Sequence, residues 1–388
     1  LVAHATAAVM TGIAGETIGL GFVLLSNRAD PMPSTRIAAL NLFEHLRRAG
    51  LEPVVCHEPT TPTECPALSL DPQELRRRGI QCVVFQKVHG PQALMLSRRL
   101  RDAGLATIYL VCDLVDAEMA DATDATIVVT DLLRSLYPAA LQPRVHVVHD
   151  GSERPDLQRT AVRPDRGSRA RPLRGVLVSS ARLRHLPQLG WPPDWLSVHV
   201  VGRYRQAETS GAPLGALRVL LDPPRPREGW MNRLAFALAP GIRRVAWGPE
   251  SVYDELLRAD IALIPSTIDN RMEPPLFPLP PWLTKSDNRL TLAMSAALPV
   301  VATPIPAYAR LVESGRNGYL AQSRAEWLDA LTRLRDPDHR HELGLTARAT
   351  VMAPFSIEHQ ARRFIDVVRS VLPNPDRAPL RGARSLQP

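Results

Sequence analysis

The sequence predicts an α/β protein made of two doubly wound, Rossmann-like domains that face each other across an interdomain cleft. Three observations lead to this prediction. The chain has 388 residues, which is long enough for two domains of ordinary size. Short continuous apolar runs alternate with amphipathic stretches, as is typical of a parallel sheet covered on both faces. The alternation stops in an arginine-rich stretch after residue 150 and then begins again.

The first domain is expected over residues 1–150, beginning with a strand in TIGLGFVLLS. The stretch STRIAALNLFEHLRRAG predicts a helix, with Ser34 as its N-cap and Gly50 at its end. Further strands are expected in LEPVVCH, GIQCVVFQ, ATIYLVCD, ATIVVT and RVHVVHDG. Helices are expected in PQALMLSRRLRDAG and DLLRSLYP.

An arginine-rich linker is expected over residues 151–172. From residue 151 to residue 185 the chain has nine arginines and three acidic residues, which predicts a solvated segment. Such a charge would suit nucleic acid, but neither interleaved aromatic residues nor a nucleic-acid motif accompanies it. The sequence therefore predicts no nucleic-acid partner.

The second domain is expected over residues 173–355, with strands in RGVLVSS, LSVHVVG, RRVAW, DIALIPS and LPVVAT. Its helices are expected in PESVYDELLRA, SDNRLTLAMSAA, RAEWLDALTRLRD and PDHRHELGLTARATVM. A last helix, capped by Ser356, is expected over residues 356–372 because its apolar residues recur every three or four positions. The polar, proline-rich tail 373–388 is expected to be disordered.

The cysteines predict a cytoplasmic protein without a metal site. Cys56, Cys65, Cys82 and Cys112 form no pair with metal-ligand spacing. Cys82 and Cys112 lie in apolar runs, where free cysteine behaves as a small hydrophobic residue, and this indicates a reducing compartment. No apolar run reaches the roughly 18 residues that span a bilayer.

The charge of the chain is unevenly distributed. Residues 1–150 contain 13 basic and 16 acidic residues, for a net charge of −3. Residues 151–388 contain 34 and 23, for a net charge of +11. An anionic ligand is therefore expected in the second half. The same charge is compatible with peripheral contact with an anionic membrane at its inner face.

Lys87 and Lys285 are the only lysines in a chain with 45 arginines. A GC-rich coding bias explains the arginines, but it does not explain where the two lysines lie. Lys285 precedes a predicted helix, with Ser286 as the candidate N-cap, and a helix N-terminus suits a phosphate group. Asn288 would bond a phosphate oxygen or a ribose hydroxyl. The alternative is an exposed lysine beside an ordinary capped helix.

Lys87, Asp113 and Asp116 follow predicted strands, where doubly wound domains bind their ligands. Their carboxylates would act as a general base or bind acceptor hydroxyls. The alternative is a lysine–aspartate pair that only closes loops.

Other side chains also follow predicted strands. Arg182 and Arg184 come after the first strand of the second domain, and they are further candidates for binding phosphate. His89 and His149 follow strands of the first domain, but a lone histidine is more often structural.

Three stretches in the order VYDELLRADIALIPS, NRLTLAMSAALPVVATPIPAYARLVESGRNGYL and LGLTARATVMAPFSIEHQARRF resemble glycosyltransferases of the GT-B fold, nearest the large family 4. The match covers about 240–370 and is looser over 17–150, where VVHDG resembles the entry to the hinge. The resemblance implies a nucleotide-diphospho-sugar donor held mainly by the second domain and an acceptor held mainly by the first. It also implies that the last helix crosses back to the first domain.

The resemblance and the residues together assign roles. The donor is expected at Lys285, Ser286, Asn288, Arg289 and the two arginines after the first strand, and Lys87, Asp113 and Asp116 are expected across the cleft. The donor is a co-substrate, so neither a separate cofactor nor a metal is expected. The acceptor would be a glycan, a lipid-linked molecule or a small molecule, in polysaccharide or glycoconjugate synthesis.

One departure from the family pattern leaves alternatives open. The family has two glutamates separated by seven residues, and alignment places Thr284 and Leu292 at these positions. Because the glutamates normally contact the donor, the sugar and the choice between retaining and inverting chemistry stay open. A non-catalytic binding or scaffold protein and a sugar-nucleotide epimerase on the same fold are the alternatives.

Overall fold

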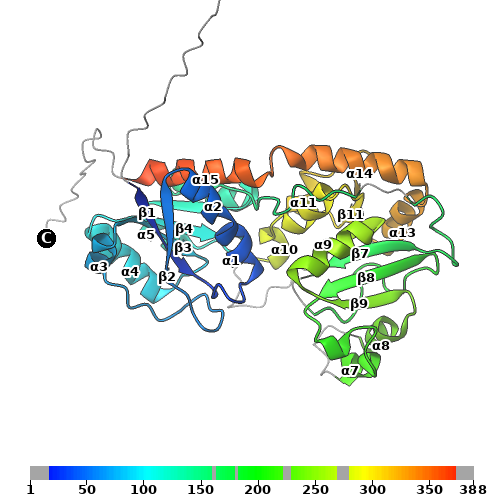
Figure 1. The fold of residues 1–388 in the computed structure, drawn as a ribbon. Helices are drawn as coiled ribbons and strands as arrows, with labels where there is room; N and C mark the ends of the chain where they lie inside the picture. Colours follow the sequence, from blue (N-terminus) through cyan, green and yellow to red (C-terminus); the bar gives the residue numbers. More distant parts are fainter. Residues whose placement is uncertain (1–16, 160–162, 180–181, 222–228, 269–278, 373–388) are drawn as a thin grey trace, which may run out of the picture. The chain divides into compact units, whose positions relative to one another are not determined.

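The computed structural model describes residues 17–159, 163–179, 182–221, 229–268 and 279–372. By their contacts these residues form two units (Figure 1). The first unit comprises the chain up to Leu110, Glu118–Thr126 and the last helix from Phe364 onward, and the second comprises Val111–Ala117 and Ile127–Arg363. The expected tail 373–388 lies outside the described residues.

Six strands form the first sheet in the order β2-β1-β3-β4-β5-β6. They are β1 (Ile18–Leu24), β2 (Leu51–His57), β3 (Ile80–Gln86), β4 (Ala106–Val111), β5 (Ala125–Val128) and β6 (Val145–Val147). The pairings among β1, β2, β3 and β4 are parallel, and each strand corresponds to a predicted apolar run. The strand order reverses between β1 and β3, which is where ligands bind in doubly wound sheets.

The helices that accompany this sheet are α1 (Pro33–Ala38), α2 (Phe43–Arg48), α3 (Pro72–Arg77), α4 (Pro91–Asp102), α5 (Ala117–Ala122) and α6 (Asp131–Ser135). The single helix predicted from Ser34 to Gly50 is wrong, because α1 and α2 are separated by the 3₁₀ turn η1 (Leu40–Leu42). The N-cap of α1 is Met32 instead of Ser34. Pro33 takes the first helical position, where its fixed φ and its missing N–H are well tolerated.

The second sheet also has six parallel strands, in the order β12-β11-β10-β7-β8-β9. They are β7 (Leu173–Val178), β8 (Leu196–Gly202), β9 (Ile242–Ala246), β10 (Ile261–Ile264), β11 (Val300–Ala302) and β12 (Tyr319–Leu320). The strand order reverses between β7 and β10, so a ligand is expected beyond the carboxyl ends of these two strands. The predicted class, α/β with two doubly wound sheets, is confirmed.

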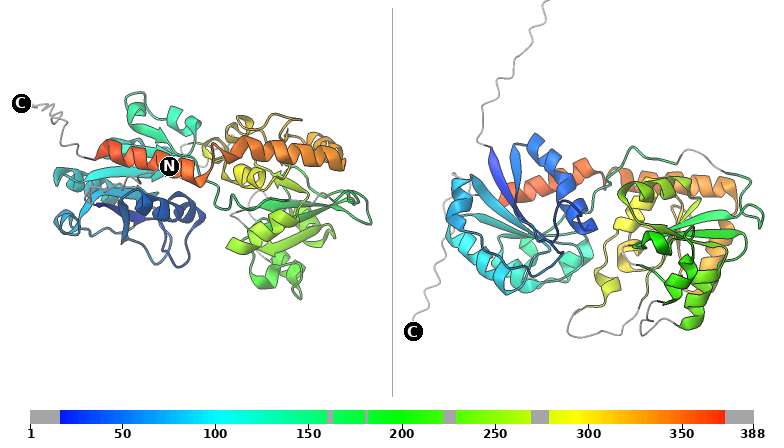
Figure 2. Two further views of the ribbon diagram at one scale, coloured as in Figure 1. Left: turned by 45° about the horizontal axis from the view of Figure 1, so that its top comes forward. Right: turned by 60° about the horizontal axis from the view of Figure 1, so that its bottom comes forward.

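Helices cover both faces of the second sheet (Figure 2). They are α7 (Gly215–Leu221), α8 (Trp230–Leu238), α9 (Pro249–Arg258), α10 (Pro281–Thr284), α11 (Asn288–Ser295), α12 (Pro306–Ala309), α13 (Arg324–Arg333) and α14 (Pro337–Met352). Leu177 of β7 belongs to a core that includes residues of α8 and α13, whereas the neighbouring Val176 belongs to a core that includes residues of α9 and α11. Successive residues of a strand point to opposite faces, so each strand contributes to both cores.

The prediction that the arginine-rich linker is solvated is wrong for part of the segment. The side chain of Arg159 is buried, and the guanidinium groups of Arg159, Arg163 and Arg166 lie 3.7–4.0 Å from the carboxylate of Asp260. Asp260 is fully buried at the start of β10 and accepts a hydrogen bond from the amide of Arg174 at 2.8 Å. A buried carboxylate requires cations nearby, and the linker supplies them.

The last helix, α15 (Ile357–Val371), has residues in both units. Ser356 caps it as predicted, because its hydroxyl accepts the amide of His359 at 3.2 Å. Within the first unit, the ring of Phe364 lies 6.5 Å from that of Phe22, and Arg369 donates to the carbonyl of Ala49.

The four cysteines are free, and Cys82 is fully buried in β3. Within the described ranges, groups of three or more His, Cys, Asp or Glu side chains that could hold a metal ion are absent. No helix among the described residues is both long enough and apolar enough to cross a membrane.

Candidate functional site

The segment from Lys285 to Arg289 connects α10 to α11 in the second unit. Lys285 ends α10 with an extended backbone, and Asp287 is the N-cap residue of α11. The prediction of Ser286 as the N-cap is therefore wrong. The hydroxyl of Ser286 is hydrogen-bonded to the carboxyl group of Asp150 instead.

Two positive charges meet at the start of α11. Burial, together with repulsion from Arg289, lowers the pKa of Lys285 to about 7. Arg289 donates a hydrogen bond to the hydroxyl of Tyr308 at 3.3 Å, and Tyr308 is fully buried. No ion pair of Lys285 is seen within the described parts of the chain. An anion bound here would stabilise the charged form of Lys285.

Asp287, which lies between Lys285 and Arg289 in the sequence, forms a buried ion pair. Asp287 is fully buried, and its Oδ2 accepts a hydrogen bond from Arg310 at 3.0 Å. Arg310 also donates to Asp131 at 2.6 Å. Burial raises the pKa of Asp287 to about 6, although Arg310 opposes this shift. The other oxygen, Oδ1, has no hydrogen-bond partner among the residues described.

A second buried carboxyl group adjoins the first. Asp150 follows β6, and burial, together with repulsion from Asp287, raises its pKa to about 7. The hydrogen bond from Ser286 opposes this shift. Near neutral pH the two carboxyl groups therefore share a site in which double ionisation is unfavourable.

His149 contributes a neutral imidazole to the same cluster. Its Nδ1 lies 2.7 Å from the carbonyl oxygen of Val129, so the ring donates from this nitrogen. Nη2 of Arg310 lies 3.3 Å from Nδ1 and 3.4 Å from Nε2, so the guanidinium group packs against the ring. Burial, with repulsion from Arg310, lowers the pKa of His149 to about 4. At neutral pH this histidine orients Arg310 without adding charge.

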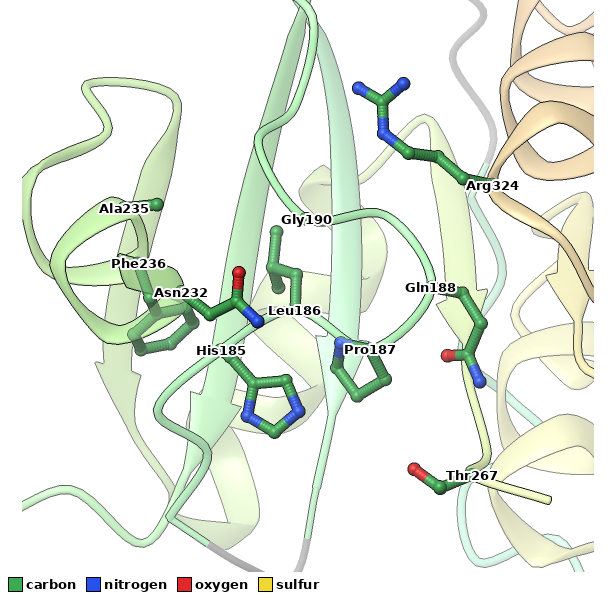
Figure 3. Close-up of a pocket in the computed structure, with 10 residues that line it drawn as sticks. All are labelled: His185, Leu186, Pro187, Gln188, Gly190, Asn232, Ala235, Phe236, Thr267 and Arg324. Atoms are coloured by element: carbon green, nitrogen blue, oxygen red, sulfur yellow. The ribbon is translucent and has the colours of Figure 1, made fainter. Parts of the chain in front are cut away.

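A cavity of about 350 Å³ lies near the point where the order of the second sheet reverses (Figure 3). Gln188, in the connection after β7, and Thr267, beyond β10, contribute to its wall together with Asn232 and Phe236 of α8. The described part of the connection, residues 182–195, contains no helix. None of the residues predicted to bind the donor lines this cavity.

Gln188 joins the two strand ends at this point. Its Nε2 donates to the carbonyl oxygen of Ser266, which follows β10. Its backbone has a positive φ of 60°, a conformation that is uncommon for residues other than glycine. Its Oε1 is buried without a hydrogen-bond partner among the described residues. The cavity therefore presents an acceptor that a hydroxyl or amide of a ligand would satisfy.

In the first unit, Lys87 forms an ion pair with Glu64 at 3.0 Å. His89 lies 3.5 Å from the other carboxylate oxygen, and the amide of His89 donates to the Glu64 carbonyl. The hydrogen bond from His89, together with attraction to Lys87, lowers the pKa of Glu64 to about 2. Lys87 therefore fixes the loop that carries Glu64. The predicted grouping of Lys87 with Asp113 and Asp116 stays a prediction.

A buried polar network lies directly before Lys87. The hydroxyl of Ser26, after β1, donates to Thr35 at 2.9 Å, and Thr35 donates to Oε1 of Gln86 at 2.9 Å. The amide of Leu25 donates to the same oxygen. The network ties the end of β1 to the end of β3, where the strand order reverses.

The two carboxylates predicted after β4 have different surroundings. Asp113 is exposed, and its charge contributes to raising the pKa of Asp150. Asp116 is half-buried, and its amide donates to the hydroxyl of Tyr137 at 3.4 Å. Asp113 therefore lies within electrostatic reach of the buried cluster.

The two predicted arginines after β7 also differ. Arg182 forms an ion pair with Glu208 at 2.8 Å, whereas Arg184 is buried. Arg182 is thus already neutralised in part, and it would bind a phosphate only by sharing its charge with Glu208. Asn288 is the first residue of α11, and it is half-buried.

The sequence alone did not identify three members of this cluster. Asp287 lies between Lys285 and Arg289, and Asp150 follows a predicted strand in VVHDG, so the sequence places both beside predicted site residues. Arg310 had no such signal, because it is one arginine among 45.

Residues 216–336 match the model of a family described as glycosyl transferases group 1. No curated protein matches the sequence significantly. The match covers the segment that carries α11 and Arg310.

Solved glycosyltransferase structures share the whole fold. HepE from Anabaena, in complex with UDP-glucose, is 12% identical with a TM-score of 0.59, and the match covers 91% of this chain and 100% of that chain. A glycosyltransferase from Rickettsia africae is 10% identical with a TM-score of 0.59, covering 93% and 100%. Sucrose-phosphate synthase from Thermosynechococcus elongatus is 15% identical with a TM-score of 0.60, covering 91% and 98%.

These similarities define the fold of the chain. The fold is GT-B, and the predicted resemblance to GT-B glycosyltransferases is confirmed. Residues 216–336 and the fold of the whole chain thus resemble those of glycosyltransferases.

The raised pKa of Asp150 predicts how stability depends on pH. Its pKa is about 7 in the folded chain and lies near 4 when unfolded, so the folded state binds more protons between these values. Stability therefore falls as the pH rises through this window. We expect Asp150→Asn to remove part of this fall, so that it stabilises the protein at about pH 8 relative to about pH 5 by on the order of 1–2 kcal/mol.

Urea unfolding of the parent and the variant at the two pH values measures this difference. Asp194→Asn is the matched control, because the side chain of Asp194 is 62% exposed. Equal pH dependence in the parent and in Asp150→Asn would show that Asp150 does not titrate as proposed.

Proposed function

We propose that the protein transfers a sugar from a nucleotide-diphospho-sugar donor to a hydroxyl group of an acceptor. The pair of half-buried cations at the start of α11 carries the proposal. Lys285 and Arg289 repel each other, and the ion pairs of the described residues do not neutralise Lys285. A diphosphate carries two negative charges, and the first amides of α11 have no carbonyl partner within the helix.

The same groups would assist the chemical step. Negative charge accumulates on the diphosphate as the bond to the sugar breaks, and a fixed cation stabilises that charge. Lys285 and Arg289 are proposed for this role, and Asn288 is proposed to bond the ribose or a phosphate oxygen. Ser286 would contribute through its backbone, because its hydroxyl is hydrogen-bonded to Asp150.

The positions aligned with the family's two glutamates support a donor site based on cations. Thr284 is buried, and Leu292 of α11 packs against the core. Neither position offers a carboxylate for the donor. We therefore propose that Lys285, Arg289 and the start of α11 provide most of the affinity for the donor.

The acceptor side is proposed for the residues after β3 and β4. Lys87 lies at the end of β3 with a fixed partner, and Asp113 is exposed after β4. An exposed carboxylate is accessible to an acceptor hydroxyl and is proposed to accept its proton. Asp116 is the second candidate for this role. A cytoplasmic location, as expected from the four free cysteines, suits such a donor.

The affinity for a nucleotide sugar should depend on the charge of Lys285. UDP-glucose is the first probe because HepE binds it, and its diphosphate stays fully ionised around neutral pH. We expect its affinity to fall as the pH rises above about 7, where Lys285 loses its proton. Lys285→Gln should weaken binding roughly ten- to a hundredfold at neutral pH. Lys285→Arg keeps the charge, so its weaker binding should fall less steeply with pH than that of the parent, and the remaining fall comes from the ionisation of Asp150.

Calorimetric titration at several pH values measures these affinities, and GDP-, ADP- and dTDP-sugars extend the panel. Arg169→Gln is the control because the side chain of Arg169 is 88% exposed. If some sugar of the panel binds equally to the parent and to Lys285→Gln, the donor site does not lie at α11. Release of free sugar or transfer to an acceptor distinguishes an enzyme from a donor-binding protein.

We also propose that transfer requires no metal ion, because cationic side chains supply the charge that a metal would supply. Turnover should persist in excess EDTA at the rate seen without it. The control adds Mg²⁺ or Mn²⁺ after chelation. Loss of activity with EDTA and its recovery with either ion would refute this proposal.

A further inference from the structure

Exposed apolar side chains gather on two helices of the second unit. Nine large hydrophobic residues are exposed among the described residues, and six of them lie between residues 214 and 238. They are Leu214, Leu217, Leu221, Trp230, Met231 and Leu238, and we call them the α7–α8 patch. Single exposed hydrophobic residues are ordinary, but such a concentration marks an interaction surface.

The spacing of these residues places them on the outer faces of the helices. Leu217 and Leu221 are four positions apart on one face of α7, and Leu214 directly precedes the helix. Val219 of the same helix is buried in the core instead. On α8, Met231 and Leu238 are seven positions apart and face outward, whereas Phe236 faces the core. Both helices are thus apolar on two sides, although only one side is covered.

Two buried arginines hold the helices in place. Arg233 of α8 donates to the carbonyls of Val219 and Leu220 at 3.1 Å, which bonds the end of α7 to α8. Arg244 of β9 donates to the carbonyls of Phe236 and Ala237, and so satisfies the end of α8. The α7–α8 patch is therefore presented by a fixed pair of helices that lie side by side (Figure 1, Figure 2).

Positive charge surrounds the patch. Arg218 is exposed on α7, and Arg205 is exposed directly before η3 (Gln206–Glu208), which packs against α7. Arg243 is exposed on β9, to which α8 packs. In the described parts of residues 203–243 the one acidic residue, Glu208, is buried and paired with Arg182.

We propose that the α7–α8 patch docks on the surface of a bilayer that contains anionic lipids. Tryptophan, methionine and leucine suit the boundary between headgroups and acyl chains, and arginines around them attract anionic headgroups. A second copy of the chain fits less well, because a twofold contact would bring the same arginines against each other. The proposal is independent of the donor site, since it uses none of the residues assigned to the donor.

Flotation of the whole protein with vesicles tests the proposal. We expect binding to phosphatidylcholine vesicles that contain phosphatidylglycerol, and weaker binding to pure phosphatidylcholine or at high salt. Leu217→Ser combined with Met231→Ser should weaken binding roughly tenfold or more, because two apolar side chains no longer enter the bilayer. Arg218→Glu should weaken binding to the anionic vesicles alone, by roughly fivefold or more.

Leu345→Ser is the matched control, because Leu345 is 42% exposed on α14 of the same unit. Thermal unfolding verifies that each variant is folded. The proposal is overturned if the parent does not float with anionic vesicles, or if the double variant floats as well as the parent. It is also overturned if sedimentation shows a dimer of the parent that the double variant abolishes while vesicle binding is unchanged.

Discussion

The buried ion pair between Asp287 and Arg310 determines the course of the chain at the start of α11. Asp287 is fully buried, and removing the partner of a buried charge costs about 3–5 kcal/mol. Arg310 lies just beyond α12 and reaches Asp287 at 3.0 Å, and the ring of His149 packs against the same guanidinium group. Because this pair is fixed, Lys285 and Arg289 stay close together although their charges repel each other.

Several groups around this pair are held away from their ordinary ionisation. Burial lowers the pKa of Lys285 and raises those of Asp150 and Asp287. Such shifts gather at functional sites because the geometry that binds a ligand is rarely the most stable one for the free chain. A bound diphosphate would offset the cost of burying the positive charge of Lys285. Its negative charge would favour the neutral form of Asp150. Binding of a donor and the protonation of the cluster are therefore linked.

The sequence predicted most strands because a parallel strand covered on both faces must be continuously apolar. The sequence also indicated the candidate site, because lysine is rare in this chain and Lys285 is one of only two. Partners far apart in the sequence were not predictable. Ser286 is not the N-cap because Asp150 takes its hydroxyl, and Arg159 is buried because Asp260 lies beneath it. Long-range pairs of this kind leave no local pattern.

The central claim is that the start of α11 binds the diphosphate of a nucleotide sugar. Hydrogen exchange of the backbone amides from Lys285 to Arg289 measures this most directly, because a bound phosphate would accept hydrogen bonds from the first amides of the helix. Saturating donor should slow exchange there, and the amides of α4 should serve as an internal reference. Unchanged exchange over this segment, under conditions in which calorimetry shows that the donor is bound, would contradict the account.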